Sequence, residues 1–444
     1  MSGRRASRSA ELGLLILSSI IVTALYALAS LGAKNHLPAT LWIFLGVILG
    51  LSLVMHFAIR WLAPRASQIL LPIATLLNGI GYVEIARWNP PEAKYQAVWA
   101  AASAVTVILV LWIVKRIRDL DRYRYLTLLA AVLLMLSPLI PHFGQLRGGA
   151  RLWVAVGPIS FQPVEIAKIL LAVFFASYFA ANREMLSVST VRIAGRGIIN
   201  LRVLVPILFA WGFAILVLGV ENDIGFAMML FALFISLIWV ATGRLGYVGA
   251  GVGLFVGGGF LGLHFFHQVH KRITIWLDPW SASHWFHLGG NQLGEGWMSI
   301  AAGGLIGTGV GLGHSNLLPA LTTDMIFAAV AEEIGLVGVI IVISCFIMFV
   351  AEGIRIAQRS HSDFARLTAT ALSITIGFQA FFIMAGVLRI LPFTGITLPF
   401  MAYGGSSLVA NYAVVALLLR ISDENGREIT GGEVHAVTFK SKRN

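Results

Sequence analysis

Cysteine is almost absent from this chain, and charged side chains are scarce. The single cysteine, Cys345, lies inside an apolar run, which excludes a disulfide framework and a thiolate metal cluster. Only 12% of the residues are charged, which is roughly half the share found in a soluble domain. The histidines show no HExxH spacing, and no small-residue cleavage site follows the basic stretch 1–8. The N-terminus therefore predicts an uncleaved first membrane span.

Long apolar runs dominate the chain, because 58% of the residues are hydrophobic. A helix needs about 20 such residues to cross the bilayer core. The runs predict an all-α polytopic membrane protein with about 12 transmembrane helices and no sizeable soluble domain. The predicted spans are 12–32, 40–60, 68–86, 95–114, 125–141, 165–181, 203–220, 224–242, 246–265, 325–351, 366–388 and 398–420.

The Lys and Arg residues predict the orientation of these spans. If the N-terminus is cytoplasmic, most of the 32 Lys and Arg residues fall on the cytoplasmic side, with the strongest cluster at 115–124. We therefore predict an N-in, C-in topology with both long connections, 142–164 and 266–324, outside. The second connection is rich in Trp and His, which favours short re-entrant or interfacial helices on the outer surface. Because topology accounts for the positive charge, we expect no nucleic-acid partner.

The first candidate constellation reads GGARLW, then FQPVEIAK, and covers 148–168. Pro163 suits the start of a helix, and Glu165 suits its first turn, where the helix dipole favours an anion. Glu165 and Lys168 are three residues apart and share a helix face. They could be an ion pair that simply allows both groups into the membrane. With Arg151, they could instead form a cationic pocket for a phosphate.

Further acidic side chains lie close to the predicted outer surface. The sequence ENDIG at 221–225 predicts a turn between two helices, for which a solvated N-cap is the plain interpretation. Asp324 begins the span that follows the long second connection. Glu332 and Glu333 lie about 12 Å further along that helix, where carboxylates need partners or a polar cavity. Pairing with an arginine such as Arg272 would be a purely structural explanation for them.

Two segments are rich in residues that break helices. The segment 303–313, GGLIGTGVGLG, has the spacing of a nucleotide-binding loop but lacks the strand before it and the helix after it. We expect its glycines to allow a tightly folded backbone near a lipid or sugar ligand. The segment 391–407 combines Pro and Gly with small hydroxyl residues. Broken helices at membrane depth are tolerated against protein or a wet cavity, which favours a substrate cleft.

Taken in order, these segments resemble the SEDS family of shape, elongation, division and sporulation proteins, which includes RodA and FtsW. The resemblance covers about 67–421 and rests on GGARLW…FQPVEIAK, ENDIG, RITIWLDP, GGLIGTGVG…LPALTTDMIFAAVAEEIG and LPFTGITLPFMAYGGSS. The family core has ten spans. The stretch 1–66 is accordingly predicted to be a two-span N-terminal addition, similar to RodA-type members from actinobacteria, and 422–444 a cytoplasmic tail.

The resemblance implies a peptidoglycan glycosyltransferase that polymerises lipid II into glycan strands for cell elongation, shape or division. It implies a multi-pass protein of the bacterial cytoplasmic membrane with its active site facing outside. It places the essential carboxylate of the family on Asp324. A divalent cation, Mg²⁺ or Mn²⁺, could bridge Asp324 and the substrate pyrophosphate. The residues expected to contact substrate are Arg151, Gln162, Glu165, Lys168, Arg272, Ser299, Glu332, Tyr403 and Ser406.

The implied partners are lipid II, a class B penicillin-binding protein that cross-links the strands, and the elongation or division machinery. Two other functions remain open. A lipid II flippase would also need a dozen spans and buried charges, and a scaffold would need no intact cleft. The position of Asp324 at the outer surface, rather than at mid-membrane, favours the enzyme.

Overall fold

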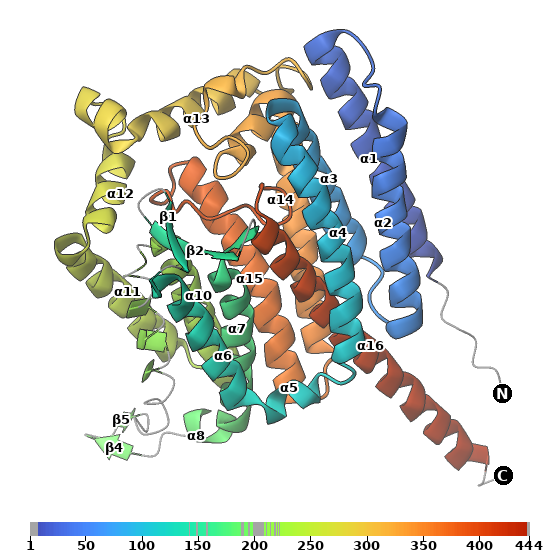
Figure 1. Ribbon diagram of the computed structural model, residues 1–444. Coiled ribbons are helices and arrows are strands. Elements are labelled where there is room, and N and C mark those ends of the chain that lie inside the picture. Colours follow the sequence, from blue (N-terminus) through green and yellow to red (C-terminus); the bar gives the residue numbers. More distant parts are fainter. Residues whose placement is uncertain are drawn as a thin grey trace.

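The computed structural model describes residues 8–441 except 142, 148–149, 157–158, 188–190, 194–195, 199–207, 210, 214, 217–218, 220 and 222. Long helices dominate it (Figure 1). The first helices are α1 (Ser9–Lys34), α2 (Leu41–Leu62), α3 (Leu70–Trp88), α4 (Pro90–Ile113), α5 (Arg118–Arg122) and α6 (Arg124–Leu136). They are followed by α7 (Pro163–Ala181), α8 (Arg183–Ser187), α10 (Ile224–Thr242), α11 (Leu245–Phe265), α12 (His267–Leu277) and α13 (Gly290–Gly303). The last are α14 (Ile326–Gln358), α15 (Asp363–Val387) and α16 (Gly405–Ser441).

Nine helices in the described part of the chain are long and apolar enough to cross a membrane. They are α1, α2, α4, α7, α10, α11, α14, α15 and α16 as far as Arg427. The helix α3 and the shorter α6 lie at two further predicted spans, and the predicted span 203–220 falls largely outside the described residues. The prediction of a helical multi-pass membrane protein is confirmed, whereas the number of spans and their orientation stay predictions.

The connection between α6 and α7 departs from the all-α expectation. The strands β1 (Gly144–Arg147), β2 (Ala150–Val156) and β3 (Ile159–Phe161) form an antiparallel sheet with β2 in the middle. Val154 of β2 pairs with Gly144 on one side and with Phe161 on the other. The run Leu-Trp-Val-Ala-Val in β2 is rich in the aromatic and β-branched residues that favour strands. A second hairpin joins β4 (Val191–Ile193) to β5 (Arg196–Ile198).

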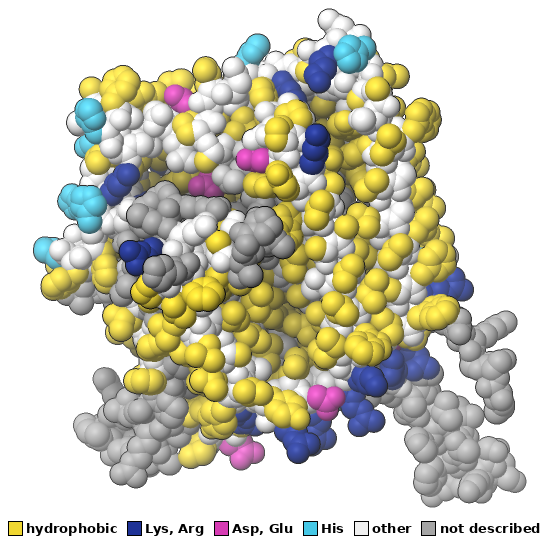
Figure 2. All heavy atoms as spheres, viewed as in Figure 1, with side chains coloured by type: hydrophobic (Ala, Val, Ile, Leu, Met, Phe, Trp, Pro, Cys, Tyr) yellow, Lys and Arg dark blue, Asp and Glu magenta, His cyan; other side chains and the backbone are white. Residues whose placement is uncertain are grey.

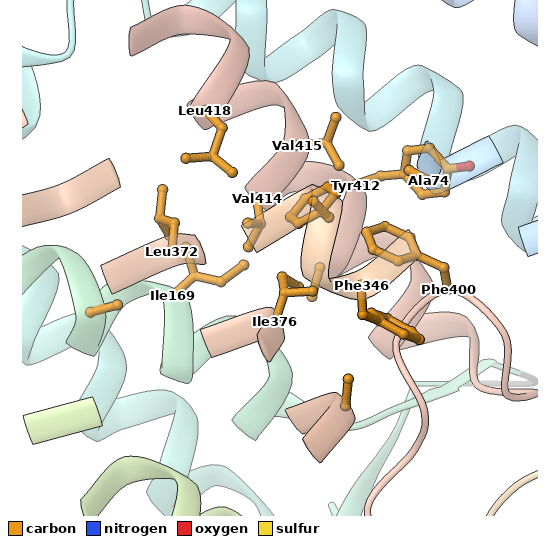
Figure 3. Close-up of a cluster of buried hydrophobic side chains, with 14 of the residues drawn as sticks. Ala74, Ile169, Phe346, Leu372, Ile376, Phe400, Tyr412, Val414, Val415 and Leu418 are labelled. Carbon is orange, nitrogen blue, oxygen red and sulfur yellow. The ribbon is translucent and has the colours of Figure 1, made fainter. Parts of the chain in front are cut away.

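The hydrophobic core lies around α7, α15 and α16. Within their apolar windows, 78%, 78% and 83% of the residues are buried, compared with 28% for α1, α2 and α4. Helices buried on all sides are central, whereas the others present one face to their surroundings. Figure 3 shows side chains of these helices meeting in one cluster that includes Ile169, Leu372 and Val414. This core holds rigid the helices that carry the candidate site.

The helix α14 is interrupted at Gly335, whose φ of 62° and ψ of −166° are not helical. The glycine-rich segment 303–313 packs against this interruption. The carbonyls of Glu332 and Glu333 accept hydrogen bonds of 2.9 and 3.1 Å from backbone N–H groups of the segment. A Cβ on Gly307 would lie only 2.1 Å from the Glu333 carbonyl oxygen. The glycines therefore permit the tightly folded backbone that was predicted, packed here against protein, and the nearby lipid or sugar ligand stays a prediction.

The junction between the N-terminal helices and the rest of the chain is held by buried arginines. Arg8 donates a 2.9 Å hydrogen bond to the carbonyl of Ala66, and its guanidinium also pairs with Glu11. From the other side, Arg420 of α16 donates at 2.9 Å to the carbonyl of Leu62. Both arginines are at most 4% exposed. The end of α2 is thus fixed to both the first and the last helix of the bundle.

The charged surface is uneven. Figure 2 shows Lys and Arg side chains gathered along the lower edge of the molecule, where α5 lies in Figure 1, beneath a broad band of hydrophobic side chains. The interfacial helices α12 and α13 lie at the opposite end of the bundle (Figure 1). This distribution agrees with the positive charges of a cytoplasmic face, although the orientation itself stays a prediction.

Candidate active site

Asp324 lies in the turn that leads into α14, outside the membrane-spanning helix. Burial raises the pKa of this carboxyl to about 7, although the positive charge of Arg272 and a hydrogen bond from Thr323 oppose the shift. A carboxyl that titrates close to neutral pH is suited to accept a proton during catalysis. The structure therefore gives Asp324 the property expected of a general base.

Arg272 of α12 interacts electrostatically with the carboxylates of Asp324 and Asp223. Its charge lowers the pKa of both Asp324 and Asp223, while burial lowers the pKa of the guanidinium itself. One guanidinium nitrogen, Nη1, donates a 2.7 Å hydrogen bond to the carbonyl of Phe393. The anchoring continues along α12, because Trp276 Nε1 donates to the carbonyl of Arg389 at 3.1 Å. The segment after α15 thus fixes the cation beside Asp324.

Asp223 caps the N-terminus of α10, as the ENDIG turn predicted, but Asp223 is buried at 6% exposure rather than solvated. Its carboxylate accepts a 3.0 Å hydrogen bond from the backbone N–H of Phe226. Burial raises the pKa of Asp223 to about 7, and burial together with Asp223 raises the pKa of Glu221 to about 9. Glu221 is 1% exposed, so at neutral pH its carboxyl is protonated. The positive charge of Arg272 opposes the rise in the pKa of Asp223, so the N-cap of α10 lies near that guanidinium.

Glu165 and Lys168 form a fully enclosed ion pair in α7. Lys168 Nζ lies 2.5 Å from Glu165 Oε2, and the two side chains are 2% and 0% exposed. The ammonium also donates to Gln379 Oε1 at 2.6 Å and lies 5.5 Å from the centre of the Phe226 ring. Of the two interpretations of this pair, the structure favours the ion pair that allows both groups into the membrane. Lys168 is not open to a phosphate in this conformation.

A chain of hydrogen bonds connects this ion pair to the broken segment 391–407. Gln379 Nε2 donates to the carbonyl of Thr397 at 2.9 Å, and the Thr397 hydroxyl lies 2.9 Å from that of Ser407. Ser406, at the start of α16, accepts a 3.1 Å hydrogen bond from the backbone N–H of Gln162. The interrupted backbone is therefore packed against protein. Non-helical backbone within a membrane is tolerated either there or beside a water-filled cavity.

Tyr403 belongs to a second polar group beside Asp324. Its backbone N–H donates to the carbonyl of Thr322 at 2.8 Å, and the Thr322 hydroxyl donates to Glu92 Oε2 at 2.7 Å. Burial, and then the charge of Glu92, raise the pKa of the Tyr403 hydroxyl. Glu92, Asp223 and Gln379 were not among the site residues predicted from the sequence. An acidic residue at the outer end of a predicted span was the signal available for Glu92.

Glu332 and Glu333 belong to a separate cluster beside the glycine-rich segment. Glu332 accepts a 2.7 Å hydrogen bond from the backbone N–H of His314 and another from the Ser315 hydroxyl. Glu333 pairs with Arg87 and accepts a 2.9 Å hydrogen bond from a glycine N–H of the segment. The expected pairing with an arginine is therefore right in kind, but the suggested partner, Arg272, is wrong. These contacts give both carboxylates a structural explanation.

Two predicted substrate contacts lie at the periphery. Arg151 is exposed on β2, and Ser299 is half-buried on α13. The described residues contain no group of three His, Cys, Asp or Glu side chains placed to hold a metal. Mg²⁺ in particular is usually bound by one or two carboxylates together with substrate phosphates. The residues around Asp324 do not build a metal cage from protein alone.

Comparison with known proteins gives consistent matches. The family model for cell cycle proteins of the FtsW, RodA and SpoVE type matches residues 89–427. Peptidoglycan glycosyltransferase RodA of Mycobacterium tuberculosis is 34% identical over 426 residues, covering 94% of this chain and 90% of the relative. A probable peptidoglycan glycosyltransferase FtsW of Legionella pneumophila is 32% identical over 304 residues, covering 67% of this chain and 73% of the relative.

Solved structures share the fold. A chain from a peptidoglycan synthase complex that coordinates polymerization and crosslinking has a TM-score of 0.65 at 23% identity, covering 81% of this chain and 98% of its own length. The rod shape determining protein RodA of Thermus thermophilus has a TM-score of 0.56 at 23% identity, covering 82% of this chain and 98% of its own length. At this level of identity the likeness shows the architecture of the helices.

Proposed function

Because this chain belongs to the FtsW, RodA and SpoVE family of cell cycle proteins, we propose that it polymerises lipid II as a peptidoglycan glycosyltransferase, with Asp324 as its catalytic carboxylate. The relatives that match over most of their length carry that activity in their names. The observation that supports the role of Asp324 is its position against Arg272 at the end of the bundle, with a pKa of about 7.

The chemistry follows from these groups. A sugar hydroxyl is a weak nucleophile, and Asp324 takes its proton as its oxygen bonds to the anomeric carbon of the donor. The bond from that carbon to the lipid pyrophosphate breaks through an oxocarbenium-like state, and the electron pair leaves with the pyrophosphate. Cations stabilise the charge that develops there. Arg272 beside Asp324 and the exposed Arg151 on β2 are the candidates for this role.

The orientation and the partner belong to the same proposal. Lipid II is polymerised outside the cytoplasmic membrane, so the end of the bundle that carries Asp324 faces outward, as the Lys and Arg distribution predicts. The partner is a class B penicillin-binding protein that cross-links the new strands within the elongation or division machinery. Support comes from the shared fold with a chain of a complex that combines polymerization and crosslinking.

The test is polymerisation of lipid II in detergent by the purified full-length protein with its penicillin-binding partner. We expect Asp324→Asn to bind the partner. Its polymerisation rate should fall about 10²–10⁴-fold, which is the usual contribution of a general base. Asp278→Asn, at an exposed aspartate of the same connection, is the matched control and should polymerise normally. Normal strands from the Asp324 variant would refute its role. Failure of the wild type to polymerise with any partner would favour a flippase instead.

A further inference from the structure

A cavity lies between α2, α3 and α4, apart from the candidate active site. Its volume is about 560 Å³, within the range of typical ligand pockets. Phe44 of α2 and Tyr82 of α3 line it, with their ring centres 5.2 Å apart. On α4 the lining includes alanines at helical spacing, among them Ala97, whose small side chains leave the space open. Tyr412, which Figure 3 shows in the buried core, also lines the cavity.

The position of the cavity indicates a hydrocarbon occupant. Only 28% of the residues in the apolar windows of α2 and α4 are buried, so these helices present much of their surface to the membrane. Protein interiors are close-packed, and an apolar space of this size that borders lipid is filled by lipid chains rather than left empty. The walls offer such a chain aliphatic and aromatic contacts along three helices.

One end of the cavity offers a charge. Among the described residues that line it, Lys94 is the only charged one, and its side chain is exposed in the first turns of α4. Thr40, in the connection between α1 and α2, lines the same cavity. A lysine at a membrane boundary holds its ammonium among headgroups while its stem lies along apolar surface. An ammonium there binds a phosphate oxygen by a charge-assisted hydrogen bond.

We propose that this cavity binds an acyl chain of an anionic phospholipid, with the lipid phosphate held by Lys94. The apolar walls recognise the chain, and the single cation recognises the headgroup. The lipid would wedge the predicted two-span addition against α3 and α4. The proposal concerns a site apart from Asp324 and stands whether or not the chain polymerises lipid II.

Native mass spectrometry of the full-length protein, titrated with dioleoyl phosphatidylglycerol or dioleoyl phosphatidylcholine, tests this site. We expect the wild type to retain one phosphatidylglycerol more tightly than phosphatidylcholine. Lys94→Gln should weaken phosphatidylglycerol binding about fivefold, the usual effect of one lysine at a lipid surface, and remove the preference. Ala97→Phe fills the cavity and should lower retention of both lipids. The controls are Lys34→Gln, at an exposed lysine that ends α1, and Val98→Phe, at a side chain 65% exposed.

Three results would overturn the proposal. The first is equal retention of phosphatidylglycerol by the Lys94 and Lys34 variants. The second is equal loss of lipid in the Ala97 and Val98 variants, which would indicate general disruption of α4. The third is displacement of phosphatidylglycerol by an equimolar polyprenyl phosphate, which would assign the cavity to an isoprenoid chain.

Discussion

Replacing Glu165 by glutamine tests whether the ion pair in α7 is structural or catalytic. The change leaves the ammonium of Lys168 buried at 2% exposure, with Gln379 as its remaining hydrogen-bond partner. Removing one partner of a buried pair typically costs about 3–5 kcal/mol, because the other charge stays in the low-dielectric interior without compensation. The double variant Glu165→Gln with Lys168→Met removes both charges. It should therefore lie within about 1.5 kcal/mol of the wild type, since methionine fills similar space.

The measurement is a double-mutant cycle on the free energy of unfolding in mixed detergent, with polymerisation measured on the same samples. The matched control is Arg366→Gln, which breaks another pair at the same i, i+3 spacing, in which Arg366 and Asp363 are 32% and 40% exposed. An exposed pair contributes about 0–1 kcal/mol, so this variant should be nearly neutral. The reasoning fails if Glu165→Gln is as stable as the wild type. Full stability with lost polymerisation in both single variants would show that the pair takes part in catalysis.

Three further predictions follow from the site and the fold. Arg272→Gln removes a charge that lowers the pKa of the Asp324 carboxyl, so the acid limb of the polymerisation rate should move to higher pH if Asp324 is the general base that we propose. A displacement by one pH unit lowers the rate about tenfold on the acid side. Lys271→Gln should leave the profile in place. Gly335→Ala puts a side chain into a glycine-only backbone conformation and should destabilise the protein by roughly 1–3 kcal/mol or more. By contrast, Gly46→Ala, with nothing within 4 Å, should be neutral or stabilising in the same unfolding assay. A reporter inserted at His284 should read as external, and a cytoplasmic signal there would contradict the predicted orientation.

The helices were predictable because bilayer thickness fixes their length and hydropathy marks them. The sheet at 144–161 was not predicted, because its strands are short and lie in a connection whose sequence was considered for its length, its side of the membrane and its candidate site residues rather than for strands. The break in α14 was also missed. Its residues are apolar on both sides of Gly335 except for Glu332 and Glu333, so the run reads as one continuous span. What breaks the helix is the glycine-rich segment, whose backbone bonds to the carbonyls just before the break.

The candidate site was predictable in part. The sequence shows which residues are charged, but it does not show which part of the fold each side chain faces. Asp324 and Arg272 were both named as candidates, and the structure brings their charges within reach of each other. Glu332 was named as well, yet its carboxylate accepts hydrogen bonds from the backbone of His314 and the hydroxyl of Ser315, just after the glycine-rich segment. Sequence spacing could not separate these cases, since each depends on which distant segment packs against the carboxylate. Gln379 was missed because an amide within an apolar helix has no distinctive sequence signal.

The arginine contacts at the end of α2 would be broken in a chain that lacks α1 and α2. A chain cut at residue 67 would leave the guanidinium of Arg420 without its acceptor at Leu62, and an unpaired buried donor costs about 1–3 kcal/mol. The same cut would remove Arg8, whose guanidinium donates to the carbonyl of Ser67, and Arg65, whose backbone N–H donates to the carboxylate of Asp423. The N-terminal helices are thus no detachable module. Their loss during evolution would require compensating changes at the far end of the sequence, in α16.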